Sequence, residues 1–376
     1  MKVFNGYLGP ILFLAAVSFG TAIAAAKPKV AAPYYEVNLR ADTAGAAANQ
    51  DPLLINAWGM ASLGAGDEFW INDEGSGVSE LVDGQGNLFA SLPSVTIPVP
   101  AGAQGPSRPT GMVANTMQDF MLPIGGPALF IFDTLDGTIA AWNNAYNSEA
   151  IIVADNSGNA VYTGLAMATS GGAPFLYAAN AHGSIDVFDD AFTPAQSAGG
   201  FADPNLPAGL TPYGIANIGG NIFVTYSQRG VATGAVDEFD PDGNLIRRFA
   251  TGGTLNAPWA VVMAPKNFGS LSNDLLIGNF GDGTINAFAP KTGKFLGKVA
   301  NSKHQPMQIS GLWALMVGAG VNGVTHHNAI YFTAGPNAEK DGLFGLILPG
   351  AGPTPTPRPK KAKPTPTPID IGGGGY

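Results

Sequence analysis

The sequence predicts an all-β protein, a six-bladed β-propeller, from two patterns that recur in phase and from an unpaired strand near each end. The first pattern is an aromatic residue or Thr, then Gly or Ala, then an apolar run, and it returns about every fifty residues. A period of this length with several short strands per copy is typical of propeller blades. The copies begin at Trp58, Thr110, Thr163, Tyr213, Trp259 and Trp313.

The second pattern lies later in each copy: Gly, any residue, an apolar residue, two residues of any kind, then a further apolar residue. It predicts a strand that follows a tight turn, because glycine adopts the positive φ angles that such turns need. The first copy departs from it, with Ser79 at the first apolar position. The other copies begin at Gly137, Gly183, Gly234, Gly283 and Gly342.

The two ends of the repeating region predict how the ring closes. Tyr34–Arg40 reads as a strand with no partner in the first copy, whereas the sixth copy supplies three strands and lacks a fourth. We expect the N-terminal strand to pair with Leu343–Leu348 and complete the last blade. That pairing would remove two exposed sheet edges.

Within each copy the elements follow one order. An inner strand such as Trp58–Ser62 comes first, and a nearly all-apolar strand such as Phe69–Ile71 follows it. Continuous apolar runs indicate burial on both faces, as in a sheet that lies between two others. Asp-Gly turns such as Asp83-Gly84 then precede an outer strand, and Pro-rich stretches such as 93–109 cross to the next blade.

The ends of the chain differ in composition from the body, residues 31–349. Residues 1–26 have one Lys, a short apolar run and small residues before Lys27, which is typical of a signal peptide. A membrane anchor is the alternative, although Pro10 and Gly20 interrupt the run. Residues 350–376 are rich in Pro and Thr, with a basic cluster, and predict a disordered, extended tail.

The amino-acid composition limits where the protein is located and what it binds. The chain has no cysteine, which excludes thiol nucleophiles, iron–sulfur clusters and thiolate zinc sites, and suits a secreted or periplasmic bacterial protein. Its formal net charge of −9 argues against nucleic-acid binding. We expect an extracytoplasmic ligand or protein as partner, no transmembrane span after signal cleavage, and contact between the basic tail and an anionic cell-surface polymer.

Polar residues near the turns that precede the third strands are the candidate site. In a propeller these turns gather on one face, so their oxygen atoms would surround the mouth of the central channel. Ca²⁺ is the ion that such carboxylates and amides would hold, and no other cofactor is indicated. The alternative is that Asn and Asp serve there to cap turns. The candidates are Asn56, Asp73, Asp133, Asn180, His182, Asn279 and Asp282.

The aromatic residues of the first pattern allow two interpretations. Trp58, Tyr213, Trp259 and Trp313 could ring the propeller axis or could wedge between neighbouring blades. We expect wedging, because aromatic side chains dominate core burial.

Several motifs resemble an uncharacterised family of exported bacterial propeller proteins, over about Tyr34 to Pro349. They include Asn56-Ala57-Trp58-Gly59, Pro109-Thr110-Gly111, Pro212-Tyr213-Gly214 and Gly278-Asn279-Phe280-Gly281. The resemblance implies the fold and export but no activity.

More distantly, the repeat is similar to NHL-type propellers and to gluconolactonase/regucalcin propellers. The second likeness implies a divalent metal and lactone hydrolysis. Those enzymes carry a metal-binding Glu-Gly-Pro at the first inner strand, where this chain has Asn56-Ala57-Trp58-Gly59 without a carboxylate.

The sequence therefore favours a non-enzymatic function: an exported module that binds a ligand or a protein. No nucleophile–base motif or phosphate loop is visible. The alternative is a divalent-metal-dependent, lactonase-like hydrolase with its site at the channel mouth.

Overall fold

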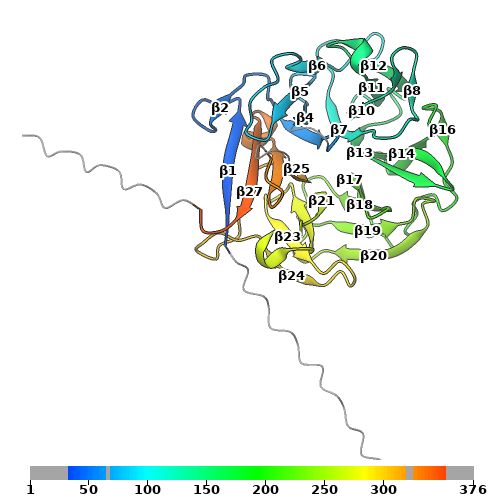
Figure 1. Ribbon diagram of the computed structural model, residues 1–376. Coiled ribbons are helices and arrows are strands. Elements are labelled where there is room, and N and C mark those ends of the chain that lie inside the picture. Colours follow the sequence, from blue (N-terminus) through cyan, green and yellow to red (C-terminus); the bar gives the residue numbers. More distant parts are fainter. Residues whose placement is uncertain (1–32, 65–67, 319–324, 353–376) are drawn as a thin grey trace, which may run out of the picture.

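Six antiparallel sheets stand as blades around a central axis (Figure 1). The computed structural model describes residues 33–64, 68–318 and 325–352, so the expected signal peptide and most of the expected tail lie outside the described residues. In the described part, the all-β class and the six blades are confirmed. No helix among these residues is long and apolar enough to cross a membrane.

Each of the first five blades is a four-stranded sheet in chain order from the axis outward. Blades 1 to 3 contain β3 (Ala57–Ala61), β4 (Glu68–Asp73), β5 (Val78–Asp83) and β6 (Ser94–Thr96); β7 (Pro109–Ala114), β10 (Phe130–Thr134), β11 (Thr138–Trp142) and β12 (Ile151–Asp155); β13 (Tyr162–Ser170), β14 (Ala173–Asn180), β15 (Ser184–Phe188) and β16 (Pro194–Ala195). Blades 4 and 5 contain β17 (Thr211–Ile218), β18 (Asn221–Ser227), β19 (Ala235–Phe239) and β20 (Leu245–Thr251); β21 (Pro258–Met263), β22 (Leu275–Asn279), β23 (Ile285–Phe288) and β24 (Phe295–Lys298).

The sixth blade joins the two ends of the body. It consists of β25 (Leu312–Val317), β26 (Ile330–Ala334), β27 (Leu343–Pro349) and the N-terminal strand β1 (Tyr34–Ala41), with β2 (Asn49–Gln50) added in parallel to β1. β1 runs antiparallel to β27, from Tyr34 opposite Pro349 to Ala41 opposite Leu343. The predicted closure of the ring is confirmed, and β1 and β27 lie side by side in Figure 1.

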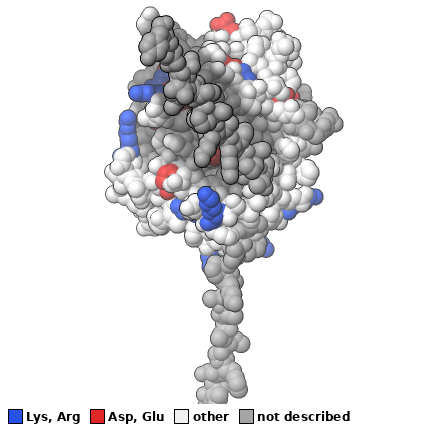
Figure 2. All heavy atoms as spheres, turned by 90° about the vertical axis from the view of Figure 1, so that its left-hand side faces the viewer, with Lys and Arg blue, Asp and Glu red and all other residues white. Residues whose placement is uncertain are grey.

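The hydrophobic core lies between the blades. Six apolar clusters each combine side chains of two neighbouring blades, so every blade depends on the next one. The second strands β10, β22 and β26 are buried along their whole length, as their continuous apolar sequences predict. On the side of the ring drawn in Figure 2, charged residues are few and scattered.

The Gly or Ala of the first pattern has a structural reason. The inner strands of adjacent blades converge at the axis, where their backbones come into contact. A Cβ on Gly111 would stand 2.6 Å from the Cα of Gly164 in the next blade, and one on Gly59 would collide with the carbonyl oxygen of Thr110. Blades 5 and 6 carry buried Ala260 and Ala314 at this position.

Polar side chains of the second strands tie neighbouring blades together beside this contact. Asn72 donates to the carbonyl oxygens of Thr110 and Gly111, at 3.0 and 3.1 Å. Thr333 of the last blade donates to the carbonyl oxygen of Trp58 in the first. These bonds satisfy backbone acceptors of the inner strands that the blade's own ladder does not use.

All six inner strands run in one direction, because each is the first strand of its blade. Their starting ends and the turns between second and third strands therefore share one face, which we call the mouth face. Their finishing ends lie on the opposite face, which we call the far face.

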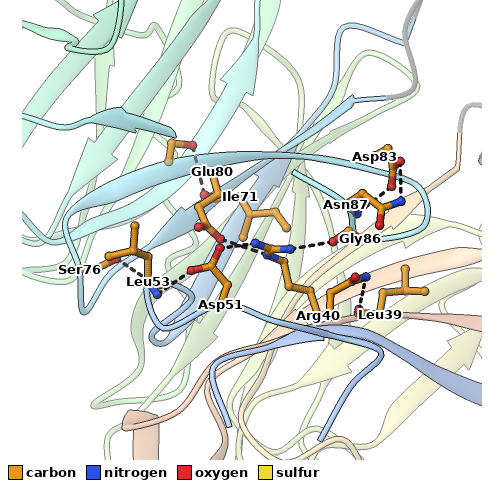
Figure 3. A network of polar contacts seen from close by, with 12 residues as sticks. Leu39, Arg40, Asp51, Leu53, Ile71, Ser76, Glu80, Asp83, Gly86 and Asn87 are labelled. Atoms are coloured by element: carbon orange, nitrogen blue, oxygen red, sulfur yellow. Dashed lines mark hydrogen bonds and ion pairs between the residues drawn. The ribbon is translucent and has the colours of Figure 1, made fainter. Parts of the chain in front are cut away.

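A buried ionic network holds the seam between blades 6 and 1 (Figure 3). Arg40 of β1 forms an ion pair with Asp51, lies 3.7 Å from a carboxylate oxygen of Glu80, and donates to the carbonyl oxygen of Gly86 at 2.9 Å. Asp73 completes the group, and all four charged side chains are at most 8% exposed. Three carboxylates thus share one guanidinium away from water.

This imbalance changes the protonation of two carboxylates. Burial, and then the negative charge of Asp51, raises the pKa of Glu80 to about 8 despite the opposing charge of Arg40. Burial, and then the charges of Glu80 and Asp51, also raises the pKa of Asp73 well above its ordinary value. The seam consequently retains protons at pH values where exposed carboxylates have lost them.

We predict that Gly111→Ala will lower the free energy of unfolding by roughly 2–3 kcal/mol, because the added methyl group overpacks two backbones. Urea denaturation measures the loss. Ala314→Gly is the matched control and should cost only about 1 kcal/mol, the usual entropic penalty of glycine. Equal losses for the two variants would contradict the close-approach argument.

We predict that Glu80→Gln will stabilise the protein increasingly as the pH rises from 5 to 9. The pKa of Glu80 is higher in the folded than in the unfolded chain, so its contribution is fully present below the unfolded pKa and is lost as the pH rises through about 8. Gln imitates the protonated carboxyl group and avoids that loss. Thermal melting across this range measures the difference. The exposed Glu149→Gln serves as control, and a pH-independent effect of Glu80→Gln would refute the prediction.

Candidate functional site

An aromatic cluster closes the central channel beneath the mouth face. The rings of Trp58 and Trp313 stack with centroids 3.5 Å apart, and Phe280 stacks on the other side of Trp313 at 4.2 Å. Tyr213 and Trp259 meet Trp313 edge-on, at 5.9 and 6.0 Å. We call these five residues the plug.

The plug lies on the axis, since its rings come from the inner strands of blades 1, 4, 5 and 6 and from a turn of blade 5. The indole nitrogen of Trp259 donates to the carbonyl oxygen of Thr163 in blade 3, at 2.8 Å. Trp58 and Trp313 are only 4% and 1% exposed, so water reaches them from neither end of the channel. The expectation that the aromatic residues wedge between blades is wrong; the convergence of the inner strands brings them together.

Charged and polar side chains surround the plug on the mouth face. They are Asn56, Glu74, Arg108, Tyr213, Arg229 and Glu339, which we call the mouth cluster. They come from blades 1, 2, 4 and 6, from segments that begin an inner strand or that connect a second to a third strand. The topology of the ring thus assembles residues that are far apart in the sequence.

Asn56 and Glu74 connect the plug to the charged groups. Asn56 accepts a hydrogen bond from the indole nitrogen of Trp313 at 2.8 Å and donates to Glu74 at 2.9 Å. The other oxygen of Glu74 pairs with the Nε of Arg108 at 2.6 Å. Glu74 is 8% exposed whereas the side chain of Arg108 is 54% exposed, so the buried carboxylate orients a guanidinium that faces solvent.

The guanidinium groups retain free donors. Among the hydrogen bonds of the described residues, none uses the two Nη atoms of Arg108 or the side chain of Arg229. Arg229 is exposed and acts electrostatically on both Tyr213 and Glu339. Two cationic groups are therefore available to a ligand above the plug.

Glu339 is placed by an unusual backbone. The short segment α1 (Pro336–Glu339) contains three successive non-glycine residues at positive φ: Asn337 at 54°, Ala338 at 57° and Glu339 at 66°. L-residues pay roughly 1–2 kcal/mol each in this region. A strained turn that carries a charged residue to a channel mouth is the kind of feature that functional sites retain.

Desolvation and neighbouring charges perturb two members of the mouth cluster. The pKa of Glu339 is raised, first by desolvation and then by the charge of Glu74, and Arg229 and Arg108 oppose the shift. The pKa of the Tyr213 hydroxyl is raised by burial and then by Glu339. These interactions show that Glu339 lies within electrostatic range of the other charged members.

Of the seven candidate residues from the sequence, Asn56 lies in the mouth cluster. Asp73 belongs to the seam network. Asp133 is fully buried and accepts a hydrogen bond from Thr110 at 2.7 Å, and burial raises its pKa to about 7.

The remaining four candidates form local turn contacts. Asn180 accepts from the backbone nitrogens of Val161 and His182, and exposed His182 contacts the carbonyl oxygen of Asn159 at 3.0 Å. Asn279 donates to Asp282, which also accepts from Thr284. The structure therefore does not bring the seven residues together around one ligand.

Sequence reasoning missed most of the mouth cluster. Glu74 directly follows the candidate Asp73. Because side chains alternate in direction along an extended chain, Glu74 was expected to point away from Asp73. Arg108, Arg229 and Glu339 lie in connecting segments outside the two repeating patterns. An arginine just before an inner strand, as at Arg108, was the available signal.

Comparison with known proteins identifies relatives of this chain. It is 32% identical over 343 residues to uncharacterized protein R648 of Acanthamoeba polyphaga mimivirus, covering 85% of this chain and 82% of the relative. Uncharacterized protein L690 of the same virus is 30% identical over 327 residues, covering 80% and 82%. The chain belongs to the family of these proteins. These relatives come from a giant virus of amoebae and not from bacteria, which corrects the expectation of a bacterial family. No family model matches the chain.

Solved structures support the fold. A glucose dehydrogenase superposes with a TM-score of 0.53 at 12% identity, over 85% of this chain and all of that chain. A putative gluconolactonase superposes with a TM-score of 0.50 at 14% identity, over 84% and 97%. At such low identity the likeness concerns the propeller architecture alone.

We predict that Ala338→Gly will raise the free energy of unfolding by about 0.5–1 kcal/mol, because relief of the left-handed strain exceeds the added chain entropy. Thermal melting measures the gain. Ala145→Gly, in the short 3₁₀ helix Asn144–Tyr146 (η1), is the control and should lose stability. A loss in both variants would show that the turn is not strained.

Proposed function

We propose that the protein is an exported ligand-binding propeller whose site is the mouth cluster, and that its ligand is a small molecule carrying a carboxylate. The observation that carries this proposal is that the guanidinium groups of Arg108 and Arg229 both act electrostatically on Glu339 beside the plug. A guanidinium offers paired donors that match a carboxylate, and Arg108 is already oriented by Glu74.

The remaining members of the site supply selectivity. Half-buried Tyr213 and Phe280 offer aromatic surface to the apolar part of a ligand. Glu339 accepts hydrogen bonds and repels ligands that carry a second negative charge at its position. A rigid ring with such a mouth is pre-organised, which lowers the entropic cost of binding.

The alternative, a metal-dependent lactonase, lacks an assembled ligand set in the described part of the chain. No three His, Asp or Glu side chains there lie close enough together to hold a metal ion. The oxygens expected to converge are instead used by the seam, by Thr110 and by turn contacts. Binding is therefore the function that this geometry supports better.

We predict that Arg108→Gln and Arg229→Gln will each weaken binding of a carboxylate ligand by tenfold or more, since each removes a charged hydrogen-bond donor worth roughly 1.5–3 kcal/mol. A thermal-shift screen of sugar acids and short organic acids finds the ligand, and isothermal titration calorimetry of the variants measures the loss. Lys266→Gln is the control, because this exposed residue follows an inner strand on the far face.

Calcium is the second titrant of the same screen. Stabilisation by millimolar Ca²⁺ that persists in both arginine variants would favour the hydrolase alternative. If no carboxylate binds, or if Lys266→Gln weakens binding as much as the arginine variants do, the proposed site is wrong.

A further inference from the structure

A hollow opens on the far face, at the other end of the channel from the mouth cluster. It is a well of about 340 Å³ on the axis, lined by the later residues of all six inner strands. Its inner end reaches Gly59, Gly111 and Trp259, directly beneath the plug. Since the plug separates it from the mouth cluster, the well is an independent site.

The floor of the well is aromatic. Trp259 is the member of the plug that lines it, and this residue is half-buried, unlike Trp58 and Trp313. Its indole N–H is already bonded to the carbonyl oxygen of Thr163. The ring therefore presents an apolar surface with no free donor.

The walls are rich in methionine. Four of the nine methionines of the chain, Met60, Met112, Met167 and Met316, line the well from blades 1, 2, 3 and 6. Three of them are half-buried, and Met112 is 6% exposed. Thioether groups adapt to the shape of a ligand and make favourable contacts with the edges of aromatic rings.

Charged side chains are absent from the lining of the well. Its polar side chains are Ser62 and Asn217, and the amide of Asn217 is occupied by the carbonyl oxygen of Met167 and the nitrogen of Gly220, at 2.8 and 2.9 Å. Each inner strand pairs with one neighbour only, so its other edge turns backbone groups toward the axis. The well thus combines apolar walls with backbone donors and acceptors.

We propose that this well binds a small, uncharged aromatic molecule. The ring lies against Trp259, the methionine thioethers surround it, and one hydroxyl or N–H group of the ligand bonds to the strand edges. A volume of 340 Å³ is at the small end of the range for ligand pockets, which suits a molecule of one or two rings. The lack of a charged lining residue excludes an ionic ligand on desolvation grounds.

Indole is the probe that tests the proposal. The full-length protein is labelled at its methionine methyl groups and titrated with indole, and methyl NMR spectra report the binding. We expect saturable shifts at Met60, Met167 and Met316, and none at Met121, which is 59% exposed in β8 (Met121–Leu122).

The double variant Met167→Gln with Met316→Gln keeps the side-chain length and introduces amides into the wall. We expect it to weaken indole binding about tenfold or more, because its amides must be desolvated. Met121→Gln is the matched control and should bind indole normally, as should Arg229→Gln at the mouth. A melting curve for each variant establishes that it is folded.

Three results would overturn the proposal. They are the absence of saturable methyl shifts up to the solubility of indole, undiminished binding in the folded double variant, and equally tight binding of cyclohexanol and phenol. The first would leave a well filled by water, and the last would make the site apolar but not aromatic-selective.

Discussion

The close approach of the inner strands at the axis is the constraint on which the rest of the structure depends. Six strands that start side by side leave no room for a Cβ on Gly59 or Gly111. Where the residue at the preceding position is aromatic, as in blades 1, 4, 5 and 6, its ring lies at the centre. The aromatic residues at that position have nowhere to pack except against one another. The plug is thus a consequence of ring closure, and it separates the mouth cluster from the well.

The mouth cluster and the well differ in chemistry because their residues come from different parts of the blades. The mouth face is built from connecting segments, which tolerate charged residues and positive φ angles, as at Glu339. The well is built from the strands themselves, whose side chains are also needed between blades and are therefore apolar. A polar site at one end of the axis and an apolar site at the other follow from the same architecture.

Charge is handled differently at the seam and at the mouth. At the seam, Arg40 faces three buried carboxylates, and the deficit of positive charge is met by protons on Glu80 and Asp73. At the mouth, Glu74 is matched by Arg108, and two guanidinium groups remain open to solvent. The first arrangement serves closure of the ring, whereas the second leaves binding capacity unused by the protein itself.

The repeat, the six blades and the pairing of Tyr34–Arg40 with the last blade were determined by the sequence alone. Turn glycines and apolar runs mark each copy, and a strand without a partner at each end of the repeats indicates how the ring closes. The sequence also predicted that the turns between second and third strands share one face of the ring. What only the tertiary structure decided was which side chains meet. The sequence pattern predicts that Asp73 and Asp133 lie at the channel mouth, yet the structure places Asp73 in the seam network and Asp133 in the core, bonded to Thr110. Arg108, Arg229 and Glu339 share no pattern, and they converge because blades far apart in sequence return their loops to one axis.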